Sequence, residues 1–583
     1  MRQLWIGAAI FGMTLVNFFQ FPGHTWLQQD SQIYAPILEH MWDPAVLQKD
    51  IVARHPHVAF TLYDEVAIAL RRVTALDFQH VLQAEQFLTR ALGIWGAYLI
   101  AAALGLSDLL ALLAASVFAL DAYIVGPVVL VFEYEPTPRA FAVPLLFLAM
   151  GLAGRKRYLG AAIAASVAFL MHPPTTVPFW IIYLALAVWP PDRRKLAALW
   201  VIVAAVLVLF AAARLQSASG QAQTLFSRVG PHQEQLQRLR ASYNWVSTWW
   251  QQYMVHYLIL YAATAIASWR LWTSTPRALR FFFLGLPLIG MVSVPVSHVL
   301  LERLHWALIP EFQPTRALLF VTAFAMLLGA AAACHAVAKK RYVEAAAWLA
   351  LAFLPPTNTV MEWPSWNRVG VVLSLALLTM AAIHLVESGS RWSRLAPLAA
   401  ILAPLFLIPT WGKVENYPAL HTPELEQLSR WARTSTPEDA VFLFADVGRD
   451  LAPGIFRAEA VRAIYVDWKS GGQVNFFKDL GEEWWSRWQQ TMAKPFDRRD
   501  VTRYRALGID YIVVTPKNRL PAAPAFENAR YVVYRLDGEP RACASGNGGI
   551  AVRAHQSDSR AWQFSVVRGA RGLPFQKLET RPG

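Results

Sequence analysis

The chain has 583 residues, of which 56% are hydrophobic, 13% aromatic and only 16% charged. Soluble domains carry about 25% charged residues, so this composition excludes a soluble enzyme, a disordered scaffold and a fibrous repeat. The formal net charge of +14 in so apolar a chain is first interpreted as basic cytoplasmic loops, and we expect no nucleic-acid partner. The two cysteines, Cys334 and Cys543, allow neither a disulfide framework nor a cysteine-based metal site.

Apolar runs predict about thirteen membrane-spanning helices, because one span needs roughly 20 mostly apolar residues. The first, 4–21, follows Met1-Arg2 and is interpreted as an uncleaved signal anchor. Several runs are shorter than a full span, so one pair could be re-entrant. The other predicted spans are 84–106, 109–131, 140–153, 158–171, 177–190, 196–213, 254–272, 281–301, 317–338, 343–355, 369–386 and 394–411.

Basic clusters fall in every second loop if Arg2 lies on the cytoplasmic side, as the positive-inside rule requires. We therefore predict an inner-membrane protein with a cytoplasmic N-terminus and everything after about residue 412 outside. The clusters are Arg155-Lys156-Arg157, Arg193-Arg194-Lys195, Arg270 with Arg277 and Arg280, Lys339-Lys340-Arg341, and Arg391 with Arg394.

The predicted fold is a mainly α, polytopic membrane domain over 1–411, followed by a small α/β extracytoplasmic domain over 412–583. Beyond Trp411 the apolar runs shorten to strand length and alternate with helical patterns. Predicted strands are 440–445, 461–466 and 509–514, with helices at 423–433 and 501–507. Predicted outer loops are 22–83, 132–139, 214–253, 302–316 and 356–368.

Little in the C-terminal region predicts chemistry of its own. Asp467 and Lys469 are expected to pair across a turn, and the tryptophans near residues 484–488 are expected to pack this domain onto the membrane helices or to stack on sugars. No independent catalytic site is predicted here.

The predicted outer loops hold the unusual acids. Asp30 and Tyr34 lie in the first loop, shortly after the first span. The segments 133–139 and 311–316 resemble each other, since each reads acid, aromatic, Glu or Gln, Pro, Thr and then Arg at the start of a membrane helix. The similarity is explained equally by a shared way of starting a helix, with proline in the first turn and acids near the N-terminus.

Three of these acids form a candidate metal site. Glu133 and Glu135 lie two apart, so an extended segment points both carboxylates to one side. With Asp30 they would offer oxygen ligands suited to Mg²⁺ or Mn²⁺. The alternative is that both glutamates pair with Arg139 as a helix-capping cluster. His172, between two predicted spans, could contact a phosphate or sugar hydroxyl, or bond only to water or backbone.

These motifs together resemble the GT-C superfamily of integral-membrane glycosyltransferases. The resemblance rests on Asp30-x-x-x-Tyr34 soon after a cytoplasm-starting first helix, on Glu133-Tyr134-Glu135 in the second outer loop, on about thirteen spans and on an outer C-terminal domain. Members typically begin the first loop with an Asp-Glu pair, whereas Ser31 stands in the second position here.

The resemblance implies inverting transfer of a sugar from a polyprenyl-phosphate-type donor to a glycan, lipid or protein acceptor at the outer face. Asp30 would act as general base, with Glu133 and Glu135 beside it as catalytic or metal-binding acids. Arg139, Arg316 or a divalent ion would offset charge on the leaving phosphate. With the two arginines, we assign Tyr34, His172 and Glu311 as substrate-binding residues.

Two other functions fit the same pattern. In a transporter or lipid-linked glycan flippase, the segments at Glu133 and Glu311 would be repeat-related gates. The chain could also be a non-catalytic partner in surface-polysaccharide assembly. Transporters usually place polar residues mid-span, whereas Asp121 is the main exception in otherwise apolar spans. This distribution favours chemistry at the membrane boundary.

Overall fold

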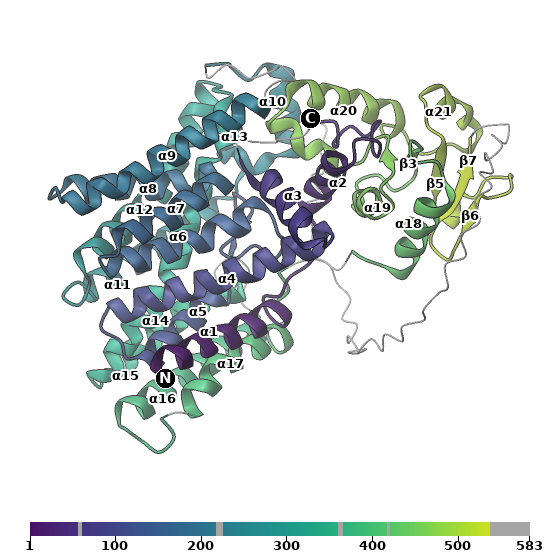
Figure 1. Ribbon diagram of the computed structural model, residues 1–583. Coiled ribbons are helices and arrows are strands. Elements are labelled where there is room, and N and C mark those ends of the chain that lie inside the picture. The colour runs from purple at the N-terminus through teal and green to yellow at the C-terminus, as the bar shows by residue number, and fades with distance from the viewer. Residues whose placement is uncertain (56–60, 217–225, 359–364, 394, 417–419, 537–583) are drawn as a thin grey trace.

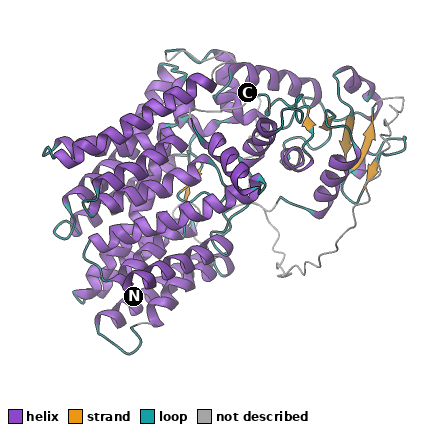
Figure 2. Cartoon of the chain, in the orientation of Figure 1, coloured by secondary structure: helices purple, strands orange, loops and turns teal. Residues whose placement is uncertain are grey.

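The protein is described by a computed structural model that covers residues 1–55, 61–216, 226–358, 365–393, 395–416 and 420–536. Long helices run side by side through the larger part of the molecule (Figure 1). Most strands gather at the end away from these helices (Figure 2). The predicted loops 214–253 and 356–368, Cys543 and the tail after residue 536 lie partly or wholly outside the described residues.

Helices occupy all thirteen regions in which spans were predicted. The main helices of this part are α1 (Arg2–Phe19), α2 (Ser31–Trp42), α3 (Tyr63–Thr74), α4 (Phe78–Ala103), α5 (Asp108–Ala119), α6 (Pro138–Gly154), α7 (Tyr158–Met171), α8 (Pro173–Val188), α9 (Arg193–Gln216), α10 (Pro231–Arg240), α11 (Gln251–Arg270), α12 (Arg277–Ser297), α13 (Leu308–Phe312), α14 (Leu318–Ala338), α15 (Tyr342–Phe353), α16 (Trp366–Glu387) and α17 (Leu395–Thr410).

Four helical stretches among the described residues are long and apolar enough to cross a membrane, namely Arg193–Gln216, Arg277–Arg303, Leu308–Ala338 and Trp366–Glu387. The chain is thus a multi-pass membrane protein by the length and composition of its helices, whereas the count of thirteen spans stays a prediction. These helices differ in how far the rest of the chain covers them. The apolar window of 308–338 is 100% buried by other parts of the chain, whereas that of 193–216 is only 22% buried.

The predicted span 109–131 is wrong in its second half. Helix α5 ends at Ala119, and the chain then forms a short antiparallel hairpin of β1 (Tyr123–Ile124) and β2 (Val129–Leu130). The carboxylate of Asp121 accepts a hydrogen bond from the backbone N–H of Phe132, which closes the base of the hairpin. Ile124, Val129 and Leu130 of the hairpin are buried in the protein core, so hydropathy alone did not distinguish this hairpin from a helix.

The two ends of helix α6 separate two sets of charges. Arg139 lies in its first turn and Arg155 follows its last residue. Near Arg155, the guanidinium of Arg2 donates to the carboxylate of Asp108 at 2.7 Å. Helix α6 packs closely on α4, because Gly96 brings the α4 backbone against Leu148, where a Cβ would lie 2.3 Å from the Leu148 nitrogen. This packing fixes the position of α6, and therefore of Arg139 at its start, relative to α4.

The C-terminal region contains a five-stranded sheet in the order β4-β3-β5-β7-β6. Strand β3 runs parallel to β4 and β5, and β7 is antiparallel to β5 and β6. The elements are α18 (Pro423–Ser435), β3 (Val441–Phe444), α19 (Ala452–Ala460), β4 (Ala463–Ile464), α20 (Lys478–Thr491), α21 (Thr502–Ala506), β5 (Tyr511–Val514), β6 (Phe526–Glu527) and β7 (Val532–Arg535).

Helix α2 belongs to the core of this C-terminal region, although it comes from the first predicted outer loop. Ile33 and Ile37 share a buried apolar cluster with Val474 and Trp484. Burying apolar area of this kind is the main force that holds two segments together. The first loop, in which Asp30 directly precedes α2, is therefore held against the C-terminal region.

Candidate functional site

Asp30 immediately precedes α2 and meets two cations. Its Oδ1 accepts a hydrogen bond from the Lys469 ammonium at 2.7 Å, and its Oδ2 lies 3.7 Å from Nη2 of Arg139. The Asp30 side chain is 40% exposed and makes no capping bond to its own helix. Burial of the carboxyl opposes ionisation, but the charges of Lys469 and Arg139 prevail and lower the pKa of Asp30 far below its usual range. Asp30 is therefore an ionised, accessible carboxylate.

Arg139 joins the second predicted outer loop to Asp30. Helix α6 begins at Pro138, so Arg139 lies in its first turn. Its Nε donates to Oε1 of Glu133 at 3.0 Å, and both side chains are only 10% exposed. Glu133 also accepts from the backbone N–H of Leu130 at 3.3 Å. Glu133 thus pairs with Arg139, which was the predicted alternative to metal binding.

Glu135 holds the backbone of the first loop. Its Oε1 accepts hydrogen bonds from the backbone N–H groups of Gln28 and Gln29 at 2.6 and 2.7 Å and from the Ser31 hydroxyl at 2.7 Å. Its Oε2 accepts from the backbone N–H of Ser31 at 3.1 Å. Burial raises the pKa of Glu135 against these hydrogen bonds. These contacts surround Asp30 in sequence, so Glu135 sets its position without touching its carboxylate.

The predicted metal site of Asp30, Glu133 and Glu135 is not assembled. Among the described residues, no group of three histidines, cysteines or acids is arranged to hold a metal ion. Asp30 is held by Lys469 and Arg139, Glu133 by Arg139, and Glu135 by the backbone of 28–31. A hard cation would have to displace ammonium and guanidinium groups that already neutralise two of these carboxylates. The residues therefore do not fit a shared Mg²⁺ or Mn²⁺ ion, and metal dependence stays a prediction without a site.

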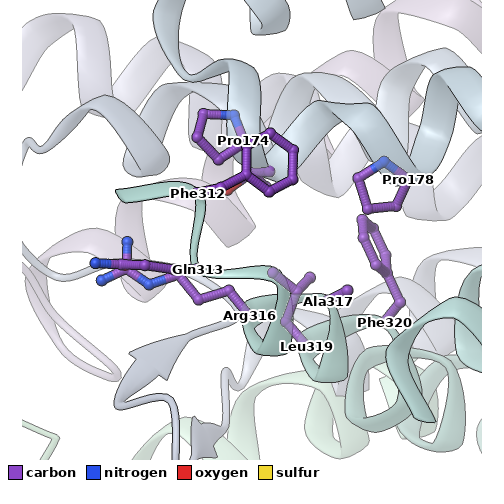
Figure 3. A pocket seen from close by; sticks show the side chains of 9 residues that line it. Pro174, Pro178, Phe312, Gln313, Arg316, Ala317, Leu319 and Phe320 are labelled. Atoms are coloured by element: carbon purple, nitrogen blue, oxygen red, sulfur yellow. The ribbon is translucent and has the colours of Figure 1, made fainter. Parts of the chain in front are cut away.

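Arg316 lies beside this cluster, next to an apolar pocket. It sits in a short 3-10 turn at Pro314–Ala317, directly before α14. Its Nε is buried and, among the described residues, lacks a hydrogen-bond partner. The pocket is seen in Figure 3, lined by Pro174, Thr175, Pro178, Phe312, Gln313, Arg316, Ala317, Leu319 and Phe320. Arg316 thus contributes a buried guanidinium, a group that binds phosphate oxygens well, to the lining of a small and mostly apolar pocket.

His172 faces the two arginines from the junction of α7 and α8. Its Nδ1 accepts a hydrogen bond from the backbone N–H of Thr175 at 3.3 Å and so caps α8. Burial, followed by the charges of Arg139 and Arg316, lowers its pKa well below the usual value. A neutral histidine that caps a helix matches the predicted backbone-bonded alternative, while its closeness to both arginines keeps it at the edge of the cluster.

Two predicted substrate residues have different positions. The Tyr34 ring packs edge-on against Tyr63, with ring centroids 5.2 Å apart, one helical turn after Asp30. Burial and the charge of Asp30 raise the pKa of the Tyr34 hydroxyl. Glu311 lies on the short helix α13 and forms none of the ion pairs found among the described residues of the cluster. In the similar segments 133–139 and 311–316, the arginines Arg139 and Arg316 therefore lie near each other, whereas Glu311 does not join Glu133 in the cluster.

Lys469 is the site residue that the sequence did not identify. We expected it to pair with Asp467, but its ammonium contacts Asp30, which lies 439 positions earlier. The Asp467 carboxylate accepts instead from the backbone N–H of Lys469 at 3.0 Å and from Arg457. No local pattern marks Lys469, because its partner becomes a neighbour only when α2 packs into the C-terminal core.

Comparisons with known proteins give one family match, which covers a small part of the chain. Residues 423–491 match a family described as a domain of unknown function, DUF6798. No curated protein matches the chain. The matched region contains α18, β3, α19, β4 and α20, and therefore Lys469.

Solved structures show similarity over most of the length. ArnT from Cupriavidus metallidurans matches in the apo state with 13% identity and a TM-score of 0.45, covering 91% of this chain and 98% of ArnT. The same protein bound to undecaprenyl phosphate gives 14% identity and 0.46, covering 92% and 99%. Arabinofuranosyltransferase AftD from Mycobacteria gives 15% and 0.40, covering 88% of this chain but 35% of AftD. These matches agree with the resemblance predicted from the sequence.

Proposed function

We propose that the chain is a membrane glycosyltransferase that moves a sugar from a polyprenyl-phosphate-type donor to an acceptor at the outer face of the inner membrane, with inversion. The observation that carries this proposal is the pairing of one accessible, ionised carboxylate, Asp30, with Arg139 at 3.7 Å. Arg316 lies beside this pair, and its buried Nε has no hydrogen-bond partner within the described part of the chain. A base and an anion-binding group are the two parts that sugar transfer from a phosphate requires.

In the proposed reaction, Asp30 orients the acceptor and takes its proton as the acceptor attacks the anomeric carbon. The bond from that carbon to the donor phosphate breaks, and the leaving phosphate keeps the electron pair. Arg316 and Arg139 would bind the phosphate oxygens, because a guanidinium offers two parallel N–H donors. No step involves a metal ion.

The assignment of faces rests on charge. Arg139 and Arg155 lie at opposite ends of α6, and Arg2 joins Asp108 near Arg155. By the positive-inside rule the end with Arg2 and Arg155 would be cytoplasmic. Asp30, Arg139 and Arg316 would then work outside, and the C-terminal region that supplies Lys469 would lie on the same side.

The test is transfer of radiolabelled sugar from polyprenyl-phosphate donors by the purified full chain in lipid nanodiscs. Asp30→Asn should lower the transfer rate about 10²- to 10⁴-fold, the usual contribution of a general base. Arg316→Gln should weaken donor binding. Arg430→Gln is the matched control, because Arg430 is exposed and pairs with its own-helix neighbour Glu426 on α18. Full activity of both site variants would disprove the site.

The same protein in proteoliposomes separates the proposal from its main alternative. Movement of a lipid-linked sugar across the bilayer without transfer to any acceptor would favour the transporter or flippase. Neither transfer nor movement, with all donors tested, would favour the non-catalytic partner in polysaccharide assembly.

A further inference from the structure

We propose that Arg457 is a positioning residue, which holds the ammonium of Lys469 against Asp30 through a buried relay of carboxylates. The relay assigns a task to the region that matches a domain of unknown function: it supplies a cation to a carboxylate on the first loop. The contacts themselves are independent of the reaction, whereas their effect on sugar transfer rests on the proposed function.

The first half of the relay joins Arg457 to the first loop. The side chains of Arg457 and Asp50 are both fully buried, and Nε of Arg457 donates to Oδ2 of Asp50 at 2.8 Å. The same oxygen accepts from the backbone N–H of Ile464 at 3.0 Å. Oδ1 of Asp50 accepts from the backbone N–H groups of Val52 and Ala53 at 2.9 and 3.1 Å. Asp50 thus anchors the part of the first loop that follows α2.

The second half joins Arg457 to Lys469. Its Nη2 donates to the buried carboxylate of Asp467 and, at 2.7 Å, to the hydroxyl of Ser470. Oδ2 of Asp467 accepts from the backbone N–H of Lys469 at 3.0 Å and from that of Ser470 at 3.3 Å. These bonds fix the backbone from which the Lys469 side chain extends to Asp30, and that side chain is only 13% exposed.

The chemistry of arginine explains why Arg457 can hold Asp50 and Asp467 at the same time. Its planar guanidinium presents donors in fixed directions, so one side chain bonds carboxylates on two different segments at once. Lysine carries a single ammonium on a flexible stem and would not hold both segments in one geometry. Because the group is buried and paired, loss of Arg457 would leave two carboxylates facing each other, and the segments would separate.

The experiment measures the Lys469–Asp30 contact directly in the purified full chain in detergent. A water-soluble carbodiimide couples a carboxylate to an amine only when they touch, and mass spectrometry of the digest detects the Asp30–Lys469 peptide pair. We expect this pair in the natural chain. The background is set by Lys469→Arg, which has no amine to couple.

Arg457→Met should reduce the cross-link to that background in the monodisperse, folded fraction. The control Arg430→Met removes an exposed arginine of the neighbouring α18 and should keep the full yield. A purely stabilising role for Arg457 would lower the melting temperature but leave the cross-link of the folded fraction intact, and this result would overturn the proposal. If Arg457→Met yields no folded protein, Asp467→Asn, which keeps the side-chain shape, decides by the same readout.

The test also separates this proposal from the proposed function. A natural chain that forms the cross-link but transfers no sugar disproves the glycosyltransferase and leaves the relay standing. A natural chain that transfers sugar but forms no cross-link disproves the relay alone.

Discussion

The ammonium of Lys469 lies 2.7 Å from Oδ1 of Asp30, although 439 positions separate the two residues in the chain. The carboxylate comes from the first predicted outer loop and the cation from the C-terminal region. The same two parts share an apolar core, in which Ile33 and Ile37 of α2 meet Trp484 of α20. The candidate site is therefore built by both ends of the chain, and residues 1–411 alone do not contain it.

The Lys469→Met chain should show a changed pH dependence of sugar transfer. Lys469 and Arg139 hold the pKa of Asp30 far below its usual range, so the base is ionised even in acid. Without Lys469 the pKa of Asp30 rises, the carboxylate protonates at higher pH, and the acid limb of the rate profile moves upward. The control is Lys478→Met, because Lys478 is exposed. An unmoved acid limb would contradict the proposed role of Asp30 as base.

Replacement of Glu135 by glutamine should destabilise the protein by about 1–3 kcal/mol. The carboxylate accepts from three backbone N–H groups and one hydroxyl, whereas an amide has one acceptor oxygen and turns an NH₂ donor toward other donors. Denaturant unfolding of the purified protein measures the difference. Glu482→Gln, on the exposed side of α20, serves as control. Equal stability of the two variants would show that the loop is held by other contacts.

A methyl group at Gly454 should destabilise the contact between α19 and α2. A Cβ there would lie 2.1 Å from Oε1 and 2.9 Å from Cδ of Gln32, whose side chain is buried and bonded to the carbonyl of Leu27. Gly454→Ala should cost about 1–3 kcal/mol of overpacking, measured by thermal unfolding. Gly7→Ala in α1 is the control, since its Cβ would meet nothing within 4 Å. There alanine should gain about 0.5–1 kcal/mol from helix propensity.

The contribution of His421 to stability should be lost as the pH rises above about 6.5. A hydrogen bond from Nδ1 of His421 to Oε1 of Glu459, 3.2 Å away, raises the pKa of His421 against the effect of burial. Because the pKa of His421 is higher in the folded than in the unfolded protein, its protonation stabilises the fold fully at pH values below the unfolded pKa of about 6.5. This stabilisation is lost as the pH rises through the folded pKa. His421→Gln should flatten the melting temperature over this range, whereas replacement of the exposed His232 should not. Parallel curves would exclude the pair as the cause.

Much of the helical architecture could be predicted, because apolar length and basic loop clusters are local signals. Hydropathy could not separate helices that face lipid from helices that face protein. The windows of 193–216 and 308–338 have similar hydropathy, 2.8 and 2.3, yet their burial is 22% and 100%. The hairpin after Ala119 was missed for the same reason, since an apolar run buried in protein looks like a span.

The residues of the candidate site were also predicted only in part. Asp30, Glu133 and Arg139 were placed together from their positions at the ends of predicted spans, and the structure brings them into one cluster. The shared metal ion was not supported, because the sequence does not show which cation each carboxylate meets. Lys469 could not be found, since its contact depends on the packing of α2 against a region made much later.

The distance between Asp30 and Lys469 along the chain also has a meaning in time. At about 5–20 residues per second, a ribosome needs roughly 20–90 s to pass from one to the other. Throughout that interval the first loop has neither its cation nor the core that holds α2. A chain whose synthesis stops early keeps the base but cannot assemble the site around it, so completion of the polypeptide itself would decide when the protein becomes competent.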